Sequence, residues 1–341
     1  MFKAYLTKII NSETLTSEEA KTAMDLMMKG EATSSQIASF ISILRFRGET
    51  VEEMIGFTIA MRHHMKEIPF EHPYLIDTCG TGGDGASTFN VSTAAAIVAA
   101  SGGAKVAKHG NRAVSSASGS ADVLEQLHLP VQQSLEEATK NLSEKGMSFL
   151  FAPIYHEAMK HAVAPRKEIG FRTIFNLLGP LANPVRCKKQ VIGVFSASYA
   201  QKMAQVLNRL DSEHVLIVAG NDGLDEITIT AKTSVVEVKN GEIRSYTIKP
   251  EDFGFKRGTL ADIQVSNSLQ SAQLIKRIFQ NKATDSAKHI VALNAGAALY
   301  VAGISKSLAE GVELATELIE TRKAYNLLLE LQKEGVNSHV N

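Results

Sequence analysis

Three stretches of the sequence combine residue types that bind phosphate-bearing ligands. Residues 80–85 read Gly-Thr-Gly-Gly-Asp-Gly and directly follow a short buried strand expected at 75–79. Glycine lets backbone amides approach a phosphate closely and accepts positive φ angles. Residues 90–93, Asn-Val-Ser-Thr, open a helical stretch whose free amides and dipole attract an anion. Residues 108–112, Lys-His-Gly-Asn-Arg, add cationic side chains, so the three stretches together predict an anion site.

Each stretch also has a simpler interpretation. The glycines alone are compatible with a tight turn, Asn90 and Ser92 with helix N-caps, and Lys108 and Arg112 with a solvated basic turn. The glycine run fits the dinucleotide fingerprint, which requires an acid about 20 residues later to bind the ribose. No Asp or Glu occurs between Asp84 and Asp122, and no Gly-Lys-Ser/Thr of a P-loop occurs in the sequence.

A pair of acids, Asp225 and Glu226, follows another strand expected at 214–219. Carboxylate oxygens are the ligands that Mg²⁺ takes in phosphate sites, with water completing the octahedron. The pair therefore predicts a magnesium site. An Asp-Gly surface turn at residues 222–223 is the alternative interpretation.

The elements that must position these residues alternate along the chain. Strands are expected at 75–79, 104–107, 147–151, 190–195 and 214–219, and helices at 91–101, 135–144 and 200–210. Such alternation predicts a mostly parallel sheet flanked by helices, with a hairpin at 235–247 around Asn240-Gly241 and helices from 267 onward. Ligands of parallel sheets bind at the carboxyl ends of the strands, where the three stretches and the acid pair are expected to meet.

The first seventy residues have a different character, because they show helix signals only. Thr16 with Glu19, Thr33 with Gln36 and Thr50 with Glu53 fit capping boxes. We therefore expect an α/β protein with a small N-terminal helical domain at 1–72 and a larger α/β domain at 73–341. The apolar stretch 171–178 is compatible with either part. We expect helices from about 164–185 to complete the helical domain.

Composition excludes several classes of protein. The 341 residues contain 36 Lys plus Arg and 36 Asp plus Glu, a zero net charge that argues against nucleic-acid or membrane partners. No apolar run reaches the ~18 residues of a membrane helix. Two cysteines are too few for a disulfide framework, and the first residues lack the apolar core of a secretory signal. A cytoplasmic location is expected.

Six segments, taken in order, resemble the anthranilate phosphoribosyltransferase family. They are 77–85 (DTCGTGGDG), 89–93 (FNVST), 108–112 (KHGNR), 119–125 (GSADVLE), 175–184 (FNLLGPLANP) and 223–226 (GLDE). The resemblance implies a nucleoside phosphorylase/phosphoribosyltransferase-like fold that forms a homodimer through its helical part. It also implies transfer of phosphoribosyl from 5-phosphoribosyl 1-diphosphate (PRPP) to the amine of anthranilate, with release of diphosphate, in tryptophan biosynthesis.

The resemblance also implies residue roles. Lys108, Asn111 and Arg166 would be catalytic, anthranilate would contact Gly80, Asn111 and Arg166, and Mg²⁺ would be held by Ser92, Asp225 and Glu226. PRPP would contact Gly80, Gly83, Asp84, Thr88, Asn90, Val91, Ser92, Thr93, Lys108, His109, Gly110, Asn111, Arg112, Ala113, Val114, Ser115, Ser116 and Ser120.

Two other functions remain open from the sequence. A pyrimidine-nucleoside phosphorylase shares the fold and a glycine loop, but it uses phosphate as nucleophile and does not need the Asp225–Glu226 pair. A non-catalytic nucleic-acid-binding protein on the same scaffold is disfavoured by zero net charge.

Overall fold

The computed structural model describes residues 1–113 and 119–337. The chain begins with four helices, α1 (Phe2–Ile10), α2 (Ser17–Met28), α3 (Ser34–Arg47) and α4 (Val51–His64). The hydroxyls of Thr16, Thr33 and Thr50 cap α2, α3 and α4 as predicted, each accepting from the backbone N–H three residues later. Helix α1 was not predicted individually, because its N-cap Met1 makes no side-chain capping bond.

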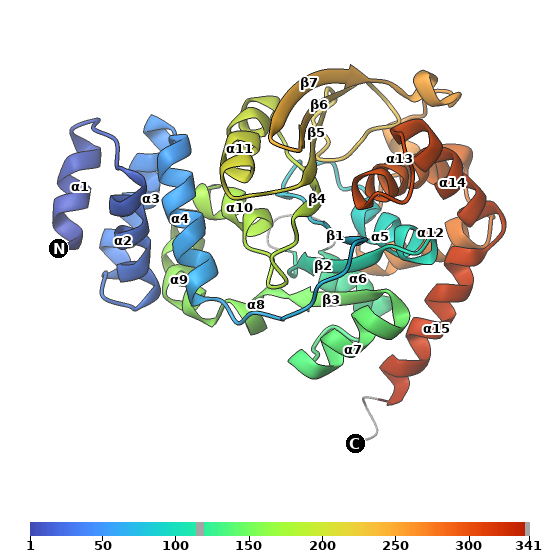
Figure 1. The fold of residues 1–341 in the computed structure, drawn as a ribbon, viewed down its shortest axis with the longest axis horizontal. Helices are drawn as coiled ribbons and strands as arrows, with labels where there is room; N and C mark the ends of the chain where they lie inside the picture. Colours follow the sequence, from blue (N-terminus) through green and yellow to red (C-terminus); the bar gives the residue numbers. More distant parts are fainter. Residues whose placement is uncertain (114–118, 338–341) are drawn as a thin grey trace.

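A seven-stranded sheet forms the centre of the rest of the molecule (Figure 1). Its order is β3-β2-β1-β4-β5-β6-β7; neighbouring strands from β3 to β5 are parallel, and β5, β6 and β7 pair antiparallel. The strands are β1 (Leu75–Thr78), β2 (Lys105–Gly110), β3 (Met147–Phe151), β4 (Lys189–Gly193), β5 (His214–Gly220), β6 (Thr233–Lys239) and β7 (Glu242–Ile248). The predicted α/β class and the Asn240-Gly241 hairpin are confirmed.

Strand β2 is longer than predicted and includes two of the predicted site residues, Lys108 and His109. The second strand was expected to end at residue 107, but β2 continues to Gly110 because Lys108, His109 and Gly110 pair with β3. Successive side chains of a strand point to opposite faces. Lys108 and His109 are therefore held on opposite sides of the sheet, and Lys108 does not lie in a solvated basic turn.

Helices cover both faces of the sheet, which explains why its strands are apolar on both sides. In β5, Leu216 and Val218 pack into one core, whereas Val215 and Ile217 pack into the other. The helices that follow the first strands are α5 (Val91–Ser101), α6 (Ser120–Gln126), α7 (Leu135–Lys145) and α11 (Ala197–Arg209). The C-terminal helices are α12 (Ser268–Phe279), α13 (Asp285–Ala302), α14 (Leu308–Glu320) and α15 (Lys323–Asn337).

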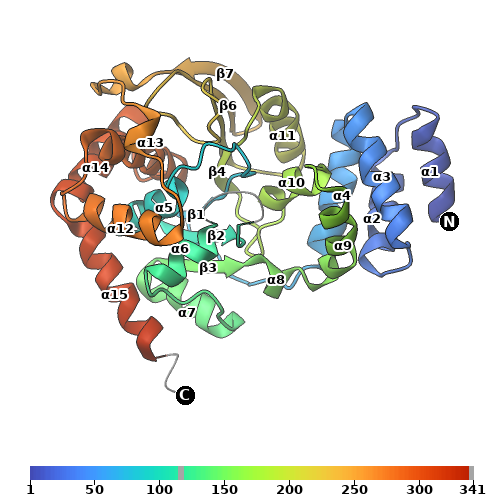
Figure 2. The same ribbon diagram turned by 180° about the vertical axis from the view of Figure 1, so that it is seen from behind.

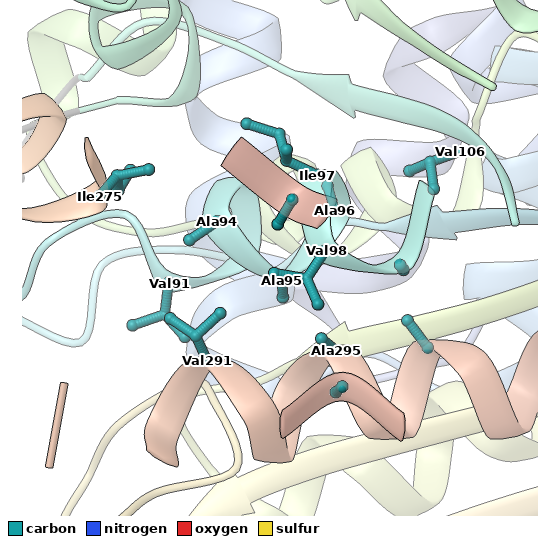
Figure 3. Packing of buried hydrophobic residues seen from close by; sticks show 14 of the residues in the cluster. Val91, Ala94, Ala95, Ala96, Ile97, Val98, Val106, Ile275, Val291 and Ala295 are labelled. Atoms are coloured by element: carbon teal, nitrogen blue, oxygen red, sulfur yellow. The ribbon is translucent and has the colours of Figure 1, made fainter. Parts of the chain in front are cut away.

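Helix α5 is buried on nearly all sides, and small residues make this possible. Val91, Ala95 and Val98 pack beside Val291 and Ala295 of α13 (Figure 3), and all five side chains are at most 1% exposed. Alanine allows two helices to approach closely without leaving a void. This packing holds the N-terminus of α5 at one place beside the sheet.

A third group of helices joins the N-terminal bundle to the sheet. It consists of α8 (Ala152–Tyr155), α9 (Lys160–Ile169) and α10 (Ile174–Leu178). Helix α9 contacts α2 and α3, and α10 contacts α3 and α4, as both views of the ribbon show (Figures 1 and 2). Pro165 lies inside α9, and the apolar stretch expected at 171–178 is helical only from Ile174. The domain boundary near residue 72 remains a prediction.

A helix that crosses a bilayer needs about 20 predominantly apolar residues. Within residues 1–113 and 119–337, no helix is both long enough and apolar enough to cross a membrane.

Candidate active site

A cleft of about 510 Å³ lies at the carboxyl ends of β1 and β2, between the sheet and the helices α8–α10. Helix α4 adds Met61 to its wall. The cleft brings together most of the predicted site residues, which are Gly80, Gly83, Asp84, Thr88, Asn90, Val91, Ser92, Lys108, His109, Gly110, Asn111, Arg112, Ala113, Ser120, Arg166, Asp225 and Glu226. Thr93 is fully buried and does not line the cleft. Val114, Ser115 and Ser116 lie outside the described residues.

The glycine loop is fixed in place by the strands on either side of it. The backbone N–H of Thr81 donates to Gly193 O at the end of β4, at 2.8 Å, and that of Gly82 donates to Asp225 Oδ2, also at 2.8 Å. Gly83 has φ +79°, and a Cβ there would lie 2.7 Å from Nε of Arg172. A side chain at Gly83 would therefore be strained and would displace the arginine.

Helix α5 presents its N-terminus to the cleft directly after this loop. Asn90 Oδ1 accepts from the Thr93 N–H at 3.0 Å, which is the capping role considered from the sequence. The Asn90 N–H donates to Ser271 Oγ at 2.9 Å, so the cap is anchored to α12. The capping and anion-binding interpretations are compatible, because the cap satisfies one helix amide while Val91 and Ser92 still line the cleft.

Lys108 is the buried cation of the site, with only 1% of its surface exposed. Its Nζ donates to Thr78 O at 2.6 Å and to Ser92 Oγ at 3.1 Å, so it connects β1, β2 and α5. Burial lowers the pKa of this amine, and the neighbouring Cys79 and acids, Glu226 and Asp225 among them, oppose that effect. A buried ammonium of this kind stabilises negative charge that arrives beside it much more strongly than a solvated one.

The acid pair lies close enough to Lys108 to affect its pKa. Asp225 is held close to the end of β4, because a Cβ at Gly193 would lie 1.6 Å from the Asp225 carbonyl oxygen. Both carboxyl groups keep some surface on the cleft wall although they lie deep in the molecule. Burial raises the pKa of Asp225, and the Asp84 carboxylate raises it further; burial and Asp225 raise the pKa of Glu226.

This donor set fits a hard divalent cation. Asp225, Glu226 and the hydroxyl of Ser92 offer oxygen ligands, and all three residues line the cleft. Mg²⁺ prefers such oxygens. Burial and the repulsion between the acids both disfavour the charged carboxylates, and a bound cation would offset both effects.

The opposite wall of the cleft carries two guanidinium groups. Arg166 of α9, the residue expected to bind an aromatic acid, lies with Cζ 5.2 Å from the Phe175 ring centre, and burial lowers its pKa. Arg172 was not identified from the sequence, although it lies only six residues further on. Its Cζ stacks 4.3 Å from the Phe195 ring centre.

Two histidines complete this region as neutral groups. His109 and His156 have ring centres 5.2 Å apart, and His156 Nε2 lies 2.9 Å from Ala182 O. Burial lowers the pKa of His109 to about 3, helped by His156, and lowers that of His156 to about 4. Arg112, by contrast, faces solvent and pairs with Asp122 and Glu125 of α6.

Comparison with known proteins identifies relatives over the full length. Residues 72–325 match the glycosyl transferase family, a/b domain, and residues 3–65 match its helical bundle domain. An anthranilate phosphoribosyltransferase of Geobacillus sp. (strain WCH70) is 59% identical over 339 residues, covering 99% of this chain and 100% of the relative.

Solved structures agree with the sequence relatives. The anthranilate phosphoribosyltransferase of Thermus thermophilus superposes with a TM-score of 0.89 at 40% identity, over 96% of this chain and 98% of that one. The Saccharomyces cerevisiae enzyme in complex with PRPP and Mg gives a TM-score of 0.89 at 27% identity, over 99% and 98%.

Proposed function

The chain belongs to the anthranilate phosphoribosyltransferase family, and we infer that it transfers phosphoribosyl from PRPP to the amine of anthranilate. The reaction releases diphosphate and belongs to tryptophan biosynthesis. One observation carries the assignment to this site: the glycine loop, the α5 N-terminus, Lys108 and the acid pair all line one cleft. The nucleoside phosphorylase and nucleic-acid-binding alternatives are set aside, because full-length relatives at 56–59% identity carry the transferase name.

We propose that the donor lies across the glycine loop and the start of α5. Breaking the bond from ribose C1 to diphosphate builds positive charge on the sugar and negative charge on the leaving group. The glycine loop, the α5 N-terminus and Lys108 line the same cleft, so they would lie beside that negative charge. Such preorganised groups lower the barrier because they need no rearrangement during the reaction.

Ser92, Asp225 and Glu226 are proposed to hold Mg²⁺. The bound ion would supply positive charge to the diphosphate oxygens. The protein's own part is to keep Asp225 close to Gly82 and Gly193, which fixes the distance between the acids and the glycine loop.

Arg166, Asn111 and Gly80 are proposed to receive anthranilate. The guanidinium of Arg166 can form a forked pair of bonds with a carboxylate, which orients the ring and its amine. An aromatic amine is unprotonated at neutral pH, so the nucleophile needs no strong general base. The low pKa values of His109 and His156, about 3 and about 4, are consistent with a site that keeps both rings neutral.

The assembly is proposed to be a homodimer formed through the helical part. Ile10 of α1 and Phe46 of α3 are 67% and 95% exposed. Large apolar side chains on helices that contact one another are typical of an interaction surface. We also propose a cytoplasmic location, with which the free thiols of Cys79 and Cys187 are compatible.

A fluorescence assay tests the function directly. Anthranilate is fluorescent, and its conversion by the purified protein should remove that signal only when PRPP and Mg²⁺ are both present. Equal loss without PRPP, or no loss with fresh PRPP and metal, would contradict the assignment. Chromatography of the reaction mixture identifies the product.

A further inference from the structure

A second cavity, of about 600 Å³, lies away from the catalytic cleft. Its walls come from α2, α4, the segment just before β4 and the C-terminal end of α11. Strands β4 and β5 begin on this side, so the cavity lies at the amino edge of the sheet, opposite the carboxyl ends that form the cleft. We call it the hinge cavity, because the N-terminal helices and the sheet region both line it.

The hinge cavity has an excess of positive charge. Lys21, Arg62, Arg186, Lys188 and Arg209 line it, against the carboxylates of Asp25 and Asp211. The Asp25 carboxylate is already engaged, because its Oδ1 lies 2.9 Å from His64 Nε2. The lining therefore carries five cations and two carboxylates, and the acids that pair with three of the cations, Glu67, Glu213 and Glu52, do not line the cavity.

Three of these cations form exposed ion pairs with surface acids. Arg186 pairs with Glu67, Lys188 with Glu213 at 3.7 Å, and Arg209 with Glu52, and the side chains of all three cations are more than half exposed. Exposed ion pairs contribute little free energy and are screened by salt. These side chains can therefore turn toward an anion in the cavity at small cost.

Arg62 is the fixed element of the hinge cavity. Its Nε donates to Leu181 O at 2.8 Å, which orients the guanidinium. Burial, together with the like charge of Arg186, lowers the pKa of Arg62 to about 10. Within residues 1–113 and 119–337 no ion pair is recorded for Arg62 or Lys21. Two guanidinium groups that repel each other would both be stabilised by an anion bound between them.

We propose that the hinge cavity binds a small phosphate-bearing anion, held between Arg62 and Lys21 on the helical side and Arg186, Lys188 and Arg209 on the sheet side. Guanidinium groups suit phosphate because their donors form two parallel bonds to its oxygens. A volume of about 600 Å³ is within the range of small-molecule sites and exceeds the needs of inorganic phosphate alone. The bound anion bridges the two parts of the chain.

The proposal is tested by counting bound anions with diphosphate as the probe. Isothermal titration of the full-length protein, without metal, is compared with that of the double variant Arg186→Gln/Lys188→Gln. Both side chains are exposed, so the variant should fold, and circular dichroism and turnover at saturating substrates verify this. The control is Lys140→Gln/Lys256→Gln, which removes the same charge from exposed positions elsewhere.

We expect the Arg186→Gln/Lys188→Gln variant to lose one diphosphate site, or to bind it at least tenfold more weakly, while the control keeps it. Lys21→Gln should weaken the same site from the helical side by a smaller factor. Unchanged stoichiometry and affinity in the double variant would overturn the proposal. An unchanged diphosphate affinity in Lys21→Gln would overturn the claim that the anion bridges the helical side and the sheet side. Because the readout is the site that is lost, it does not depend on whether the catalytic cleft also binds diphosphate.

Discussion

The catalytic cleft and the hinge cavity both gather positive charge, but they are built in different ways. In the cleft, Lys108 is 1% exposed and is held by Thr78 O and Ser92 Oγ. In the hinge cavity, Arg186 and Lys188 are more than half exposed and are held only by surface acids. A charge in a dry, fixed position acts strongly on a ligand, whereas a solvated one is screened. Removing the charge of the buried Lys108 should therefore affect ligand binding and turnover more than removing the charge of the exposed Lys188.

The largest effect is expected for Lys108→Gln. Glutamine keeps a polar donor although it is one bond shorter than lysine, and the positive charge is lost from a preorganised site. Removing one such stabilising group typically costs about 10²–10³ in turnover, and a full charge should reach about 1000-fold. Steady-state kinetics measures the loss, and circular dichroism verifies folding.

Lys105→Gln is the matched control for Lys108→Gln, because it lies on the same strand but its Nζ donates to Ser143 O outside the cleft. The control should keep nearly full activity. Equal losses in both variants would mean that strand β2, and not the buried charge, is responsible.

Next in size is Asp225→Asn/Glu226→Gln. Turnover should fall about 100-fold, and the dependence on Mg²⁺ should shift to higher concentration, because amide oxygens bind the cation more weakly. The melting temperature without metal should stay the same or rise, since two buried carboxyl groups with raised pKa are removed. An unchanged Mg²⁺ dependence would exclude these acids from the metal site.

The pH dependence of stability gives an effect of intermediate size. The pKa of His156 is lowered to about 4 by burial, so the folded state keeps this ring neutral while the unfolded state protonates it near 6.5. Stability is therefore present above pH 6.5 and is lost as the pH falls toward 4. At pH 5 the loss from this residue amounts to about 2 kcal/mol.

His156→Gln should remove this loss. Urea unfolding at pH 7 and pH 5 measures the free energy of unfolding, and the difference between the two pH values should be about 2 kcal/mol smaller in the variant. An identical difference in both proteins would show that His156 is not held neutral in the folded state.

These comparisons also show what the sequence could predict. The glycine loop, residues 90–93 and residues 108–112 were identified because each is a continuous run, and the strand pattern brought them to one edge. Lys108 was placed at a strand end, and only the pairing of β2 with β3 shows that it lies within the strand. The metal and substrate roles of individual residues remain predictions.

The residues that the sequence did not predict as functional lie far apart along the chain. Arg172 meets Gly83 only because α10 brings residues of the third helical group beside the glycine loop. The cations of the hinge cavity come from positions 21, 62, 186, 188 and 209, with no common motif. Surface arginines and lysines are ordinary in any soluble protein, and only their convergence distinguishes these.

Arg166→Ala should show a smaller effect, because the side chain lies at the cleft wall and is only partly buried. Loss of a charge-assisted pair should lower kcat/KM for anthranilate about tenfold. KM for PRPP should change little. Lys167→Ala, its exposed neighbour, is the control and should leave both constants unchanged. The reverse pattern, a raised KM for PRPP alone, would place Arg166 on the donor side.

The smallest effect is expected for Lys188→Gln in the hinge cavity without ligand. Lys188 lies 3.7 Å from Glu213, and the two side chains are 61% and 54% exposed. Such a pair is screened by water and salt, so the melting temperature should change by less than about 2 °C, and the difference should vanish in 0.5 M NaCl. Scanning calorimetry at both salt concentrations measures it. A large, salt-independent destabilisation would mean that the hinge cavity is a rigid structural element, and its contrast with the buried charge of the cleft would then not hold.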